Sequence, residues 1–306
     1  MGSVFTGFAV IALAVFVGWI AGRAGVVGPE ARPILARLTF NVLAPFLLFS
    51  VLATADVGAL FSVLLPVSAL AAVTMMLVFG LIAMLVWRRS LERAVIGSLA
   101  SGYVNGNNFG IPIAVYMLGD AAYSAPIVLL QLLLFAPVAL AILGARVEGR
   151  TSARQIVRGT FTNPIIVGSL AGVAVAVSGL ELPPIVLEPV ELIGHAAVPL
   201  MLISFGLSLN GQRMLAAGSG RREVLLASTL KLVVMPATAW LLGRFAFGLD
   251  DTALYAVTVL AALPTAQNVF NYAQRYETAE ILARDTVFIT TLGCLPVLLG
   301  LALLLG

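Results

Sequence analysis

The chain has 306 residues, of which 61% are hydrophobic and only 10% are charged. Soluble domains carry roughly 25% charged residues, so this composition excludes a protein that keeps most of its surface in water. The formal net charge of +3 does not indicate nucleic-acid binding, because the basic residues lie in the links between apolar runs.

Ten apolar runs follow one another along the chain, and each is long enough for a helix across a hydrocarbon core of about 30 Å. Their continuous apolar character, as over 64–87, favours helices over the alternating strands of an outer-membrane barrel. The sequence therefore predicts an all-α membrane protein of ten transmembrane helices. The predicted spans are 4–22, 34–54, 63–87, 94–118, 122–143, 161–180, 191–210, 223–245, 251–273 and 283–305.

The basic residues predict the orientation of these spans, because cytoplasmic links retain positive charge. If the N-terminus lies outside, fifteen of the seventeen Lys and Arg residues fall in inward links and only Arg244 falls in an outward link. Lys231 lies within span 8. We therefore expect an integral protein of the cytoplasmic (inner) membrane, with both termini outside.

The basic link at 144–160 divides the chain into two halves, 1–143 and 161–306, with five predicted spans each. A duplicated unit with an odd number of spans must insert its second copy upside down, which predicts a five-plus-five inverted repeat. The halves share local features: span 2 carries Asn41 and Pro45 before an apolar run, and span 7 carries Pro199 in a similar setting.

Span 4 contains a cluster of residues that interrupt a helix. Proline removes a backbone donor, glycine permits unwound backbone, and carboxamides facing lipid are costly. The cluster predicts a broken helix with its second half starting near Pro112. Its residues are Asn105, Gly106, Asn107, Asn108, Gly110 and Pro112.

Span 9 contains a second such cluster, formed by Pro264, Thr265, Gln267, Asn268 and Asn271. Irregular backbone at membrane depth must be buried in protein or line a water-filled cavity. Two broken helices in matching positions therefore predict a central site. Half-helices starting near Pro112 and Thr265 would direct positive dipole ends at an anion. The alternative is that proline and glycine only kink these helices and asparagine only joins neighbouring ones.

These stretches resemble the auxin efflux carrier family of bacterial and plant transporters. The resemblance rests on the stretch ending Gly110-Ile111-Pro112, on 263–268 and on Asn41 to Pro45, and it covers the whole chain. It implies an inverted repeat whose spans 4 and 9 cross, and the export or exchange of organic anions such as indole acetate or dicarboxylates. It also implies a homodimer. Plant members carry a long central loop, which the short link 144–160 replaces here.

Ionisable groups within the predicted spans are few. Every carboxylate maps to a link or to the edge of a span, with Asp285 nearest the interior, so coupling through a central acid is not expected. Coupling to a sodium ion that is held by carbonyls and carboxamides stays an open alternative. Lys231 has three interpretations: a charge in the binding site or pathway, a donor to freed carbonyls of a broken helix, or a side chain that snorkels to the cytoplasm.

The sequence favours a secondary transporter that moves a small organic anion by alternating access. An intramembrane enzyme is not expected, because the chain has one histidine, no metalloprotease motif and no paired acids at depth. We also expect no cofactor, no metal site and no nucleic-acid partner. The lipid bilayer is the expected environment. The alternatives are an ion or anion channel, and a transporter of another small solute with sodium coupling.

Overall fold

The computed structural model describes residues 2–28, 30–55, 57–147, 158, 161–208, 210 and 220–305. Within these ranges the chain is helical, with no strand and one isolated antiparallel backbone bridge between Val104 and Thr265. The predicted all-α fold class is therefore confirmed. Most of the basic link at 144–160 lies outside the described residues.

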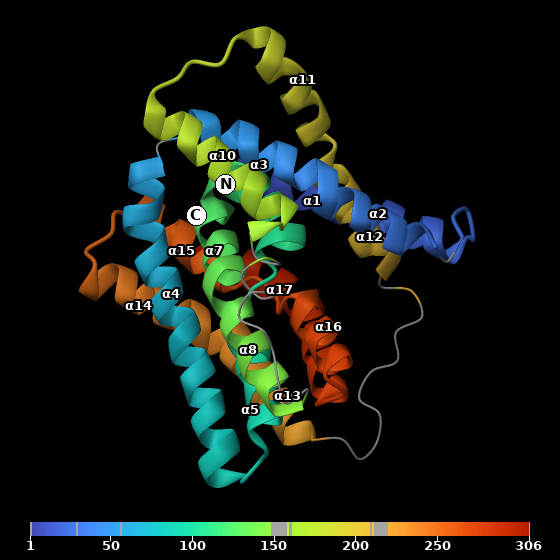
Figure 1. Cartoon of the computed structure of the whole chain (residues 1–306), viewed down its shortest axis with the longest axis vertical. Helices are drawn as coiled ribbons and strands as arrows, with labels where there is room; N and C mark the ends of the chain where they lie inside the picture. The colour runs from blue at the N-terminus through green and yellow to red at the C-terminus, as the bar shows by residue number, and fades with distance from the viewer. Residues whose placement is uncertain are drawn as a thin grey trace. The chain divides into compact units, whose positions relative to one another are not determined.

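Figure 1 shows the helices of the chain in order. Several spans contain a five-residue π-helical turn, named η here, between α-helical parts. The first half of the chain contains α1 (Gly2–Arg23), α2 (Ala31–Leu38), η1 (Thr39–Leu43), α3 (Ala44–Thr54), α4 (Val57–Leu81), η2 (Ile82–Val86), α5 (Leu91–Gly102), η3 (Gly106–Gly110), α6 (Ile111–Ile113), η4 (Ala114–Leu118), the 3-10 turn η5 (Ala121–Ser124), α7 (Ala125–Leu130), η6 (Gln131–Phe135) and α8 (Ala136–Val147).

The second half has a similar series of helices. It contains α10 (Pro164–Ser178), α11 (Pro184–His195), α12 (Ala197–Ser208), α13 (Arg221–Thr229), η7 (Leu230–Val234), α14 (Met235–Leu241), η8 (Leu242–Ala246), α15 (Asp251–Ala261), α16 (Gln267–Arg275) and α17 (Glu280–Leu305).

Each of the ten predicted spans coincides with described helix, but not every helix is long enough to cross a membrane alone. By length and composition, six described helical stretches qualify. Spans 4 and 9 fall short because each is interrupted near its middle. The full set of ten crossings stays a prediction. The six stretches are Pro33–Thr54, Leu64–Val86, Ala121–Ala145, Pro184–Leu207, Arg221–Ala246 and Glu280–Leu305.

The chain forms two compact units, and each takes segments from both predicted halves. The first unit comprises Met1–Phe61, Asn107–Leu129 and Thr160–Gln212, and the second comprises Ser62–Gly106, Leu130–Gly159 and Arg213–Gly306. The predicted halves follow the order of the chain, whereas these units follow packing.

In the first unit, helices pack closely because glycine lies at their contacts. Helix α1 packs on α12, and α10 packs on α3, as Figure 1 shows for the second pair. A Cβ on Gly206 would overlap the Val15 carbonyl, and a Cβ on Gly168 would lie 2.5 Å from the Pro45 carbonyl oxygen. Small residues at such contacts let backbones approach, which is how helices associate in lipid.

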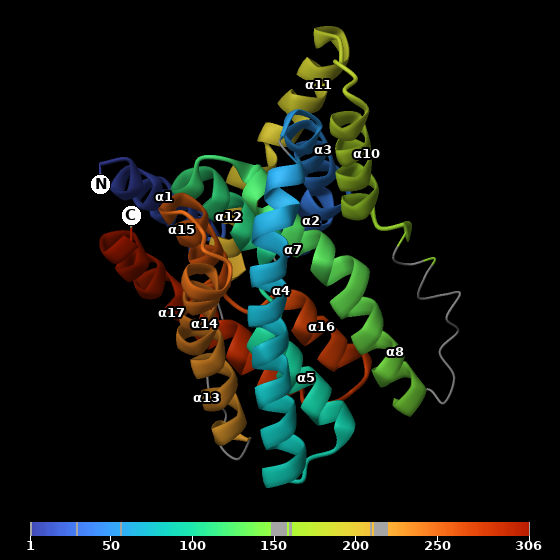
Figure 2. The ribbon, with the colours of Figure 1, turned by 90° about the vertical axis from the view of Figure 1, so that its left-hand side faces the viewer.

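In the second unit, α13 packs on α17 and on α5, and α14 packs on α15. Figure 2 shows the long helix α4 together with α5 and the turn that joins them. Phe79 on α4 is buried against Gly97 on α5, where any side chain would overlap its ring. The packing places the ends of α5 and α15, the two interrupted spans, inside this unit.

The second unit builds the same turn twice, once after η2 and once after η8. After η2, the backbone N–H of Trp87 donates to the Ile82 carbonyl at 3.0 Å, and that of Arg89 donates to Ala83 at 2.9 Å. After η8, Phe247 donates to Leu242 at 3.0 Å, and Leu249 donates to Gly243 at 2.9 Å. The corresponding bonds therefore have the same lengths.

The two turns also end alike. Ser90 and Asp250 are the N-cap residues of α5 and α15, and each side chain accepts a bond from a backbone N–H three residues later. Such caps accept hydrogen bonds from backbone N–H groups of the first helical turn that have no partner within the helix. The residues Arg88 and Gly248 occupy equivalent left-handed positions, with φ of 50° and 59°.

Candidate substrate site at the crossing of two broken helices

The two predicted breaks meet inside the second unit. Helix α5 ends at Gly102 and α15 ends at Ala261. Beyond them, the N–H of Asn105 donates to the Pro264 carbonyl at 2.7 Å, and the N–H of Ala266 donates to the Tyr103 carbonyl at 3.0 Å. Each break thus satisfies backbone groups that the other has freed, which lipid could not do.

Thr265 stabilises this crossing through both of its donors. Its hydroxyl donates to the Ala100 carbonyl in the last turn of α5 at 2.6 Å, and its N–H donates to the Thr290 hydroxyl on α17 at 3.0 Å. Carbonyls at the end of a helix have no partner within it. Thr265 therefore supplies a missing partner to α5, and its side chain is fully buried.

Lys231 supports the same crossing from η7. Its ammonium group donates to the Ala261 carbonyl at 2.6 Å and lies 3.2 Å from the Met235 sulfur. Ala261 is the last residue of α15, so its carbonyl belongs to the negative end of that helix. Because Lys231 is 0% exposed, the snorkelling interpretation is wrong. The contact is the one expected of a donor to a freed carbonyl.

The half-helices do not both start where the sequence predicts. The second begins at Gln267, two residues after Thr265. The first begins at Gly106, and Pro112 lies inside the continuous helical stretch from η3 to η4, so the prediction of a start near Pro112 is wrong. The helix resumes directly after the crossing, where the Gly106 N–H bonds the Val104 carbonyl at 2.9 Å. The π-helical turn η3 lies shortly before Pro112, whose backbone has no N–H to donate to that turn.

Two predicted carboxamides lie at the start of α16. Gln267 and Asn268 are half-buried, while Asn271, one turn further along, is exposed. The N-cap residue Ala266 has no side-chain oxygen, so no side chain caps this end. Asn268 lies beside the buried Tyr103 hydroxyl. The second unit therefore brings a helix N-terminus and two carboxamides to the crossing, a combination of donors that suits an anion.

Other predicted site residues belong to the first unit. The Asn107 side chain donates to the Asn108 side-chain oxygen at 2.9 Å, and the Asn107 oxygen is buried with no partner among the described residues. Gly110 and Pro112 are buried. Asn41 is exposed, and its side chain donates to the Arg37 carbonyl of its own helix at 2.8 Å.

Sequence reasoning missed Thr290, although a signal was present. Thr286 and Thr290 are one helical turn apart on α17, and both are fully buried. A polar stripe at that spacing in an apolar helix indicates a buried partner. Sequence reasoning also placed Asp285 and Glu223 at span edges, whereas both carboxylates are buried beside arginines: Asp285 pairs with Arg284 at 2.7 Å.

Comparison with known proteins gives consistent matches over most of the chain. A model of the membrane transport protein family matches residues 3–302. A Rhizobium meliloti protein named "Putative malonate transporter" is 28% identical over 226 residues, which are 71% of this chain and 69% of that protein. An uncharacterized transporter of Methanothermobacter thermautotrophicus is 28% identical over 305 residues, 95% of each chain. A rice protein named "Probable auxin efflux carrier component 5b" is 33% identical over 150 residues, 47% of this chain and 40% of that protein.

Proposed function

The chain belongs to the membrane transport protein family, and on this premise we propose that it is a secondary transporter of a small organic anion. The proposed substrates are mono- and dicarboxylates, moved by alternating access. Malonate is the first candidate, because one relative carries the name of a malonate transporter.

The crossing in the second unit is the observation that carries the proposal. It places the uncapped N-terminus of α16, the carboxamides of Gln267 and Asn268, and the Lys231 cation within one packed unit. All three favour negative charge, and a helix N-terminus binds carboxylates through its free N–H groups. Asn105, Gly106 and Pro264 are proposed as the backbone that shapes this part of the site. Asn107, Asn108, Gly110 and Pro112 belong to the first unit and stay proposed site residues on the sequence pattern alone.

The repeated turn supports an inverted repeat of five spans. Equivalent hydrogen bonds recur after η2 and η8, and equivalent breaks follow α5 and α15. The breaks pair antiparallel at Val104 and Thr265, as segments related by a two-fold axis would. In the first unit, α1 of the first half packs on α12 of the second half, and α10 of the second half packs on α3 of the first half. The first span of each half therefore packs on the second span of the other half.

The links that line one end of the second unit support the proposed topology. The turn before α5, the start of α13 and the turn between α16 and α17 together line one pocket. All three are links that the charge distribution assigns to the cytoplasm. We propose that this end faces the cytoplasm and that both termini lie outside.

Transport by the purified protein in liposomes tests the proposal. Liposomes loaded with unlabelled malonate should accumulate external labelled malonate above equilibrium, because a carrier exchanges one bound anion for another. A thermal-shift screen of the purified protein against mono- and dicarboxylates provides a second test. Only anions that bind the folded protein should raise its melting temperature. Flux that neither saturates nor responds to internal malonate would indicate a channel, and no flux with any carboxylate would contradict the anion assignment.

A further inference from the structure

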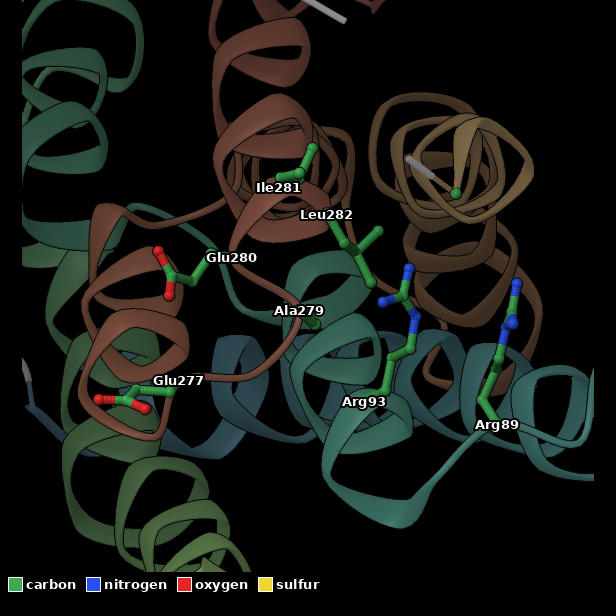
Figure 3. A pocket seen from close by; sticks show the side chains of 8 residues that line it. Arg89, Arg93, Glu277, Ala279, Glu280, Ile281 and Leu282 are labelled. Carbon is green, nitrogen blue, oxygen red and sulfur yellow. The ribbon is translucent and has the colours of Figure 1, made fainter. Parts of the chain in front are cut away.

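A second polar site lies at the proposed cytoplasmic end of the second unit, away from the crossing. It is a cavity of about 610 Å³ whose lining includes Arg89, Arg93, Gly220, Glu277, Ala279 and Glu280 (Figure 3). These residues come from the turn before α5 and its first helical turn, from the N-cap of α13, and from the turn before α17 and its first helical turn. The cavity has no part in the proposed transport of carboxylates.

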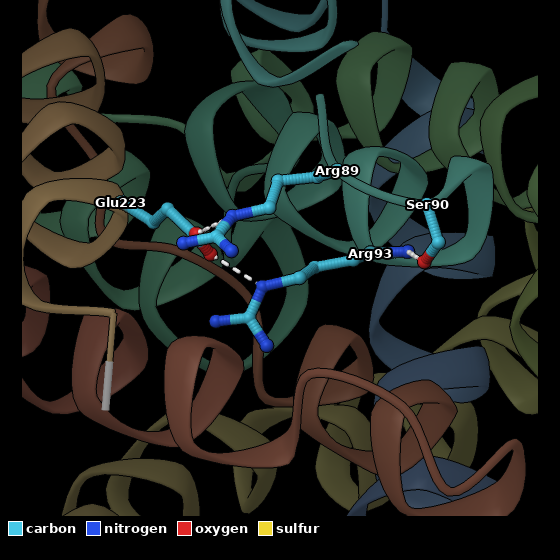
Figure 4. A network of polar contacts seen from close by, with 4 residues as sticks. All are labelled: Arg89, Ser90, Arg93 and Glu223. Carbon is cyan, nitrogen blue, oxygen red and sulfur yellow. Dashed lines mark hydrogen bonds and ion pairs between the residues drawn. The ribbon is translucent and has the colours of Figure 1, made fainter. Parts of the chain in front are cut away.

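Two arginines of the cavity wall pair with one buried carboxylate, that of Glu223 (Figure 4). The Nε atoms of Arg89 and Arg93 each lie 2.6 Å from an oxygen of Glu223, whose side chain is 2% exposed. One carboxylate thus neutralises only one of two guanidinium charges. Both ion pairs are formed through Nε, and among the described residues neither guanidinium is ion-paired with a second carboxylate. An arginine can bind phosphate or carboxylate through two parallel N–H groups.

The acidic residues on the opposite wall do not neutralise this charge. Figure 3 shows the Glu277 and Glu280 carboxylates directed away from both arginines. Among the described residues, neither glutamate forms an ion pair with Arg89 or Arg93. The interior of the cavity therefore presents the positive groups.

Gly220 makes room for the Arg93 guanidinium. A Cβ at this position would lie 2.7 Å from the Arg93 Nη2 atom, closer than a carbon can approach without displacing it. Gly220 has φ of 44° and precedes α13 without a side-chain cap. The start of α13 therefore contributes a positive dipole end on the same side as the arginines.

Backbone strain gathers around this cavity. The positive-φ residues other than glycine in the described chain are Arg88, Glu277 and Ala279, and all lie in the two turns that line it. Such a conformation is unfavourable for an L-residue, and strain of this kind is found preferentially at functional sites. The equivalent of Arg88 in the second turn is Gly248, which adopts the conformation without that cost.

The repeated turn shows that the fold does not require these charges. Where the first turn has Arg89 and Arg93, the second has Leu249 and Ala253, and its hydrogen bonds have the same lengths. The arginines therefore serve something other than the formation of the turn. Trp87 beside them is an aromatic residue at the end of span 3, as found at membrane interfaces.

We propose that this cavity binds a phosphate group, supplied by an anionic phospholipid of the cytoplasmic leaflet or by a soluble phosphate ester. Basic pockets between transmembrane helices on this side of a membrane bind lipid headgroups in this way. The bound phosphate would join the turn before α5 to the starts of α13 and α17.

Two probes separate the sources of phosphate. Glycerol 3-phosphate is added to the protein in detergent, and phosphatidylglycerol is included in phosphatidylcholine nanodiscs, with melting temperature measured in each case. Stabilisation by glycerol 3-phosphate assigns a soluble ester. Stabilisation by phosphatidylglycerol alone assigns a lipid headgroup. If neither probe stabilises the protein beyond a chloride control of equal ionic strength, the proposal is wrong.

The triple variant Arg89→Gln, Arg93→Gln, Glu223→Gln removes the site without leaving a buried unpaired carboxylate. We expect it to weaken binding of the effective probe about tenfold or more. Arg244→Gln is the matched control, because Arg244 is also ion-paired, with Asp251 at 3.6 Å, and lies in the equivalent segment η8. Unchanged binding in the triple variant would overturn the proposal. Gly220→Ala keeps every charge but displaces Arg93, so it decides the question if the triple variant fails to fold.

Discussion

Lys231 provides the sharpest test of how the crossing is held together. In Lys231→Met the ammonium group is replaced by an apolar end, so the Ala261 carbonyl loses the donor that lies 2.6 Å away. A buried carbonyl left without a partner costs about 1–3 kcal/mol. The variant also avoids burying a cation, which costs at least ~2.5 kcal/mol on insertion scales. These terms oppose each other, so overall stability should change little.

The effect of Lys231→Met should instead be local. The carbonyl left unpaired belongs to Ala261, the last residue of α15, directly before the crossing. The backbone bridge between Val104 and Thr265 should therefore open more often. A local loss of about 1–3 kcal/mol raises amide exchange by roughly 5- to 150-fold. Hydrogen exchange measured by mass spectrometry on peptides that contain Asn105 and Ala266 would report this change, because both amides donate across the bridge.

Met235→Leu is the control for this experiment. It removes the sulfur that lies 3.2 Å from the Lys231 ammonium group but leaves the bond to Ala261 in place. We expect exchange at the crossing to stay near that of the wild type. If a folded Lys231→Met protein exchanges the Asn105 and Ala266 amides at the wild-type rate, Lys231 does not support the crossing.

Four further predictions concern the anion, the crossing and the topology. Lys231→Gln removes the charge and should weaken carboxylate binding about tenfold, or 1.4 kcal/mol, whereas an unchanged dissociation constant would leave Lys231 a purely structural role. Asn107→Ala, Asn108→Ala and Asn268→Ala should each weaken binding in a folded protein, and Gln274→Ala on the exposed side of α16 should not. Thr265→Val leaves the Ala100 carbonyl without its donor and should lower the free energy of unfolding by about 1–3 kcal/mol, while Thr252→Val at an exposed position should have little effect. Cysteines at Ser3 and Ser152 should react with an impermeant reagent from opposite sides of the membrane, and labelling from one side would contradict the ten-span topology.

The two interruptions could be predicted from sequence because their residues break a helix locally. Asparagine, glycine and proline cluster at 105–112 and 264–271, and such clusters weaken a helix through their own backbone chemistry, so the interruptions of spans 4 and 9 were predictable. The exact start of the first half-helix was not. Pro112 indicated a start, but the crossing lets the chain resume its helix at Gly106, six residues earlier.

The buried ion pairs could not be predicted from the positions of charges along the chain. Glu223 lies near the start of span 8 and its partners lie near the start of span 4, so a sequence reading places all three in solvent-facing links. Packing of α13 against α5 buries the carboxylate and brings Arg89 and Arg93 to it. The positive side of the cavity arises from that packing.

Composition by itself determined the surroundings of this protein, its helical class and the approximate limits of its spans. Lipid cannot satisfy free backbone groups, so a chain this apolar must form helices or a closed barrel, and its continuous apolar runs select helices. Tertiary structure decided which groups meet. Lys231 could have paired with water, substrate or backbone, and only the packing of η7 beside the end of α15 selected the Ala261 carbonyl. A buried donor must take whichever acceptor lies within reach, and that depends on contacts between residues far apart in the chain.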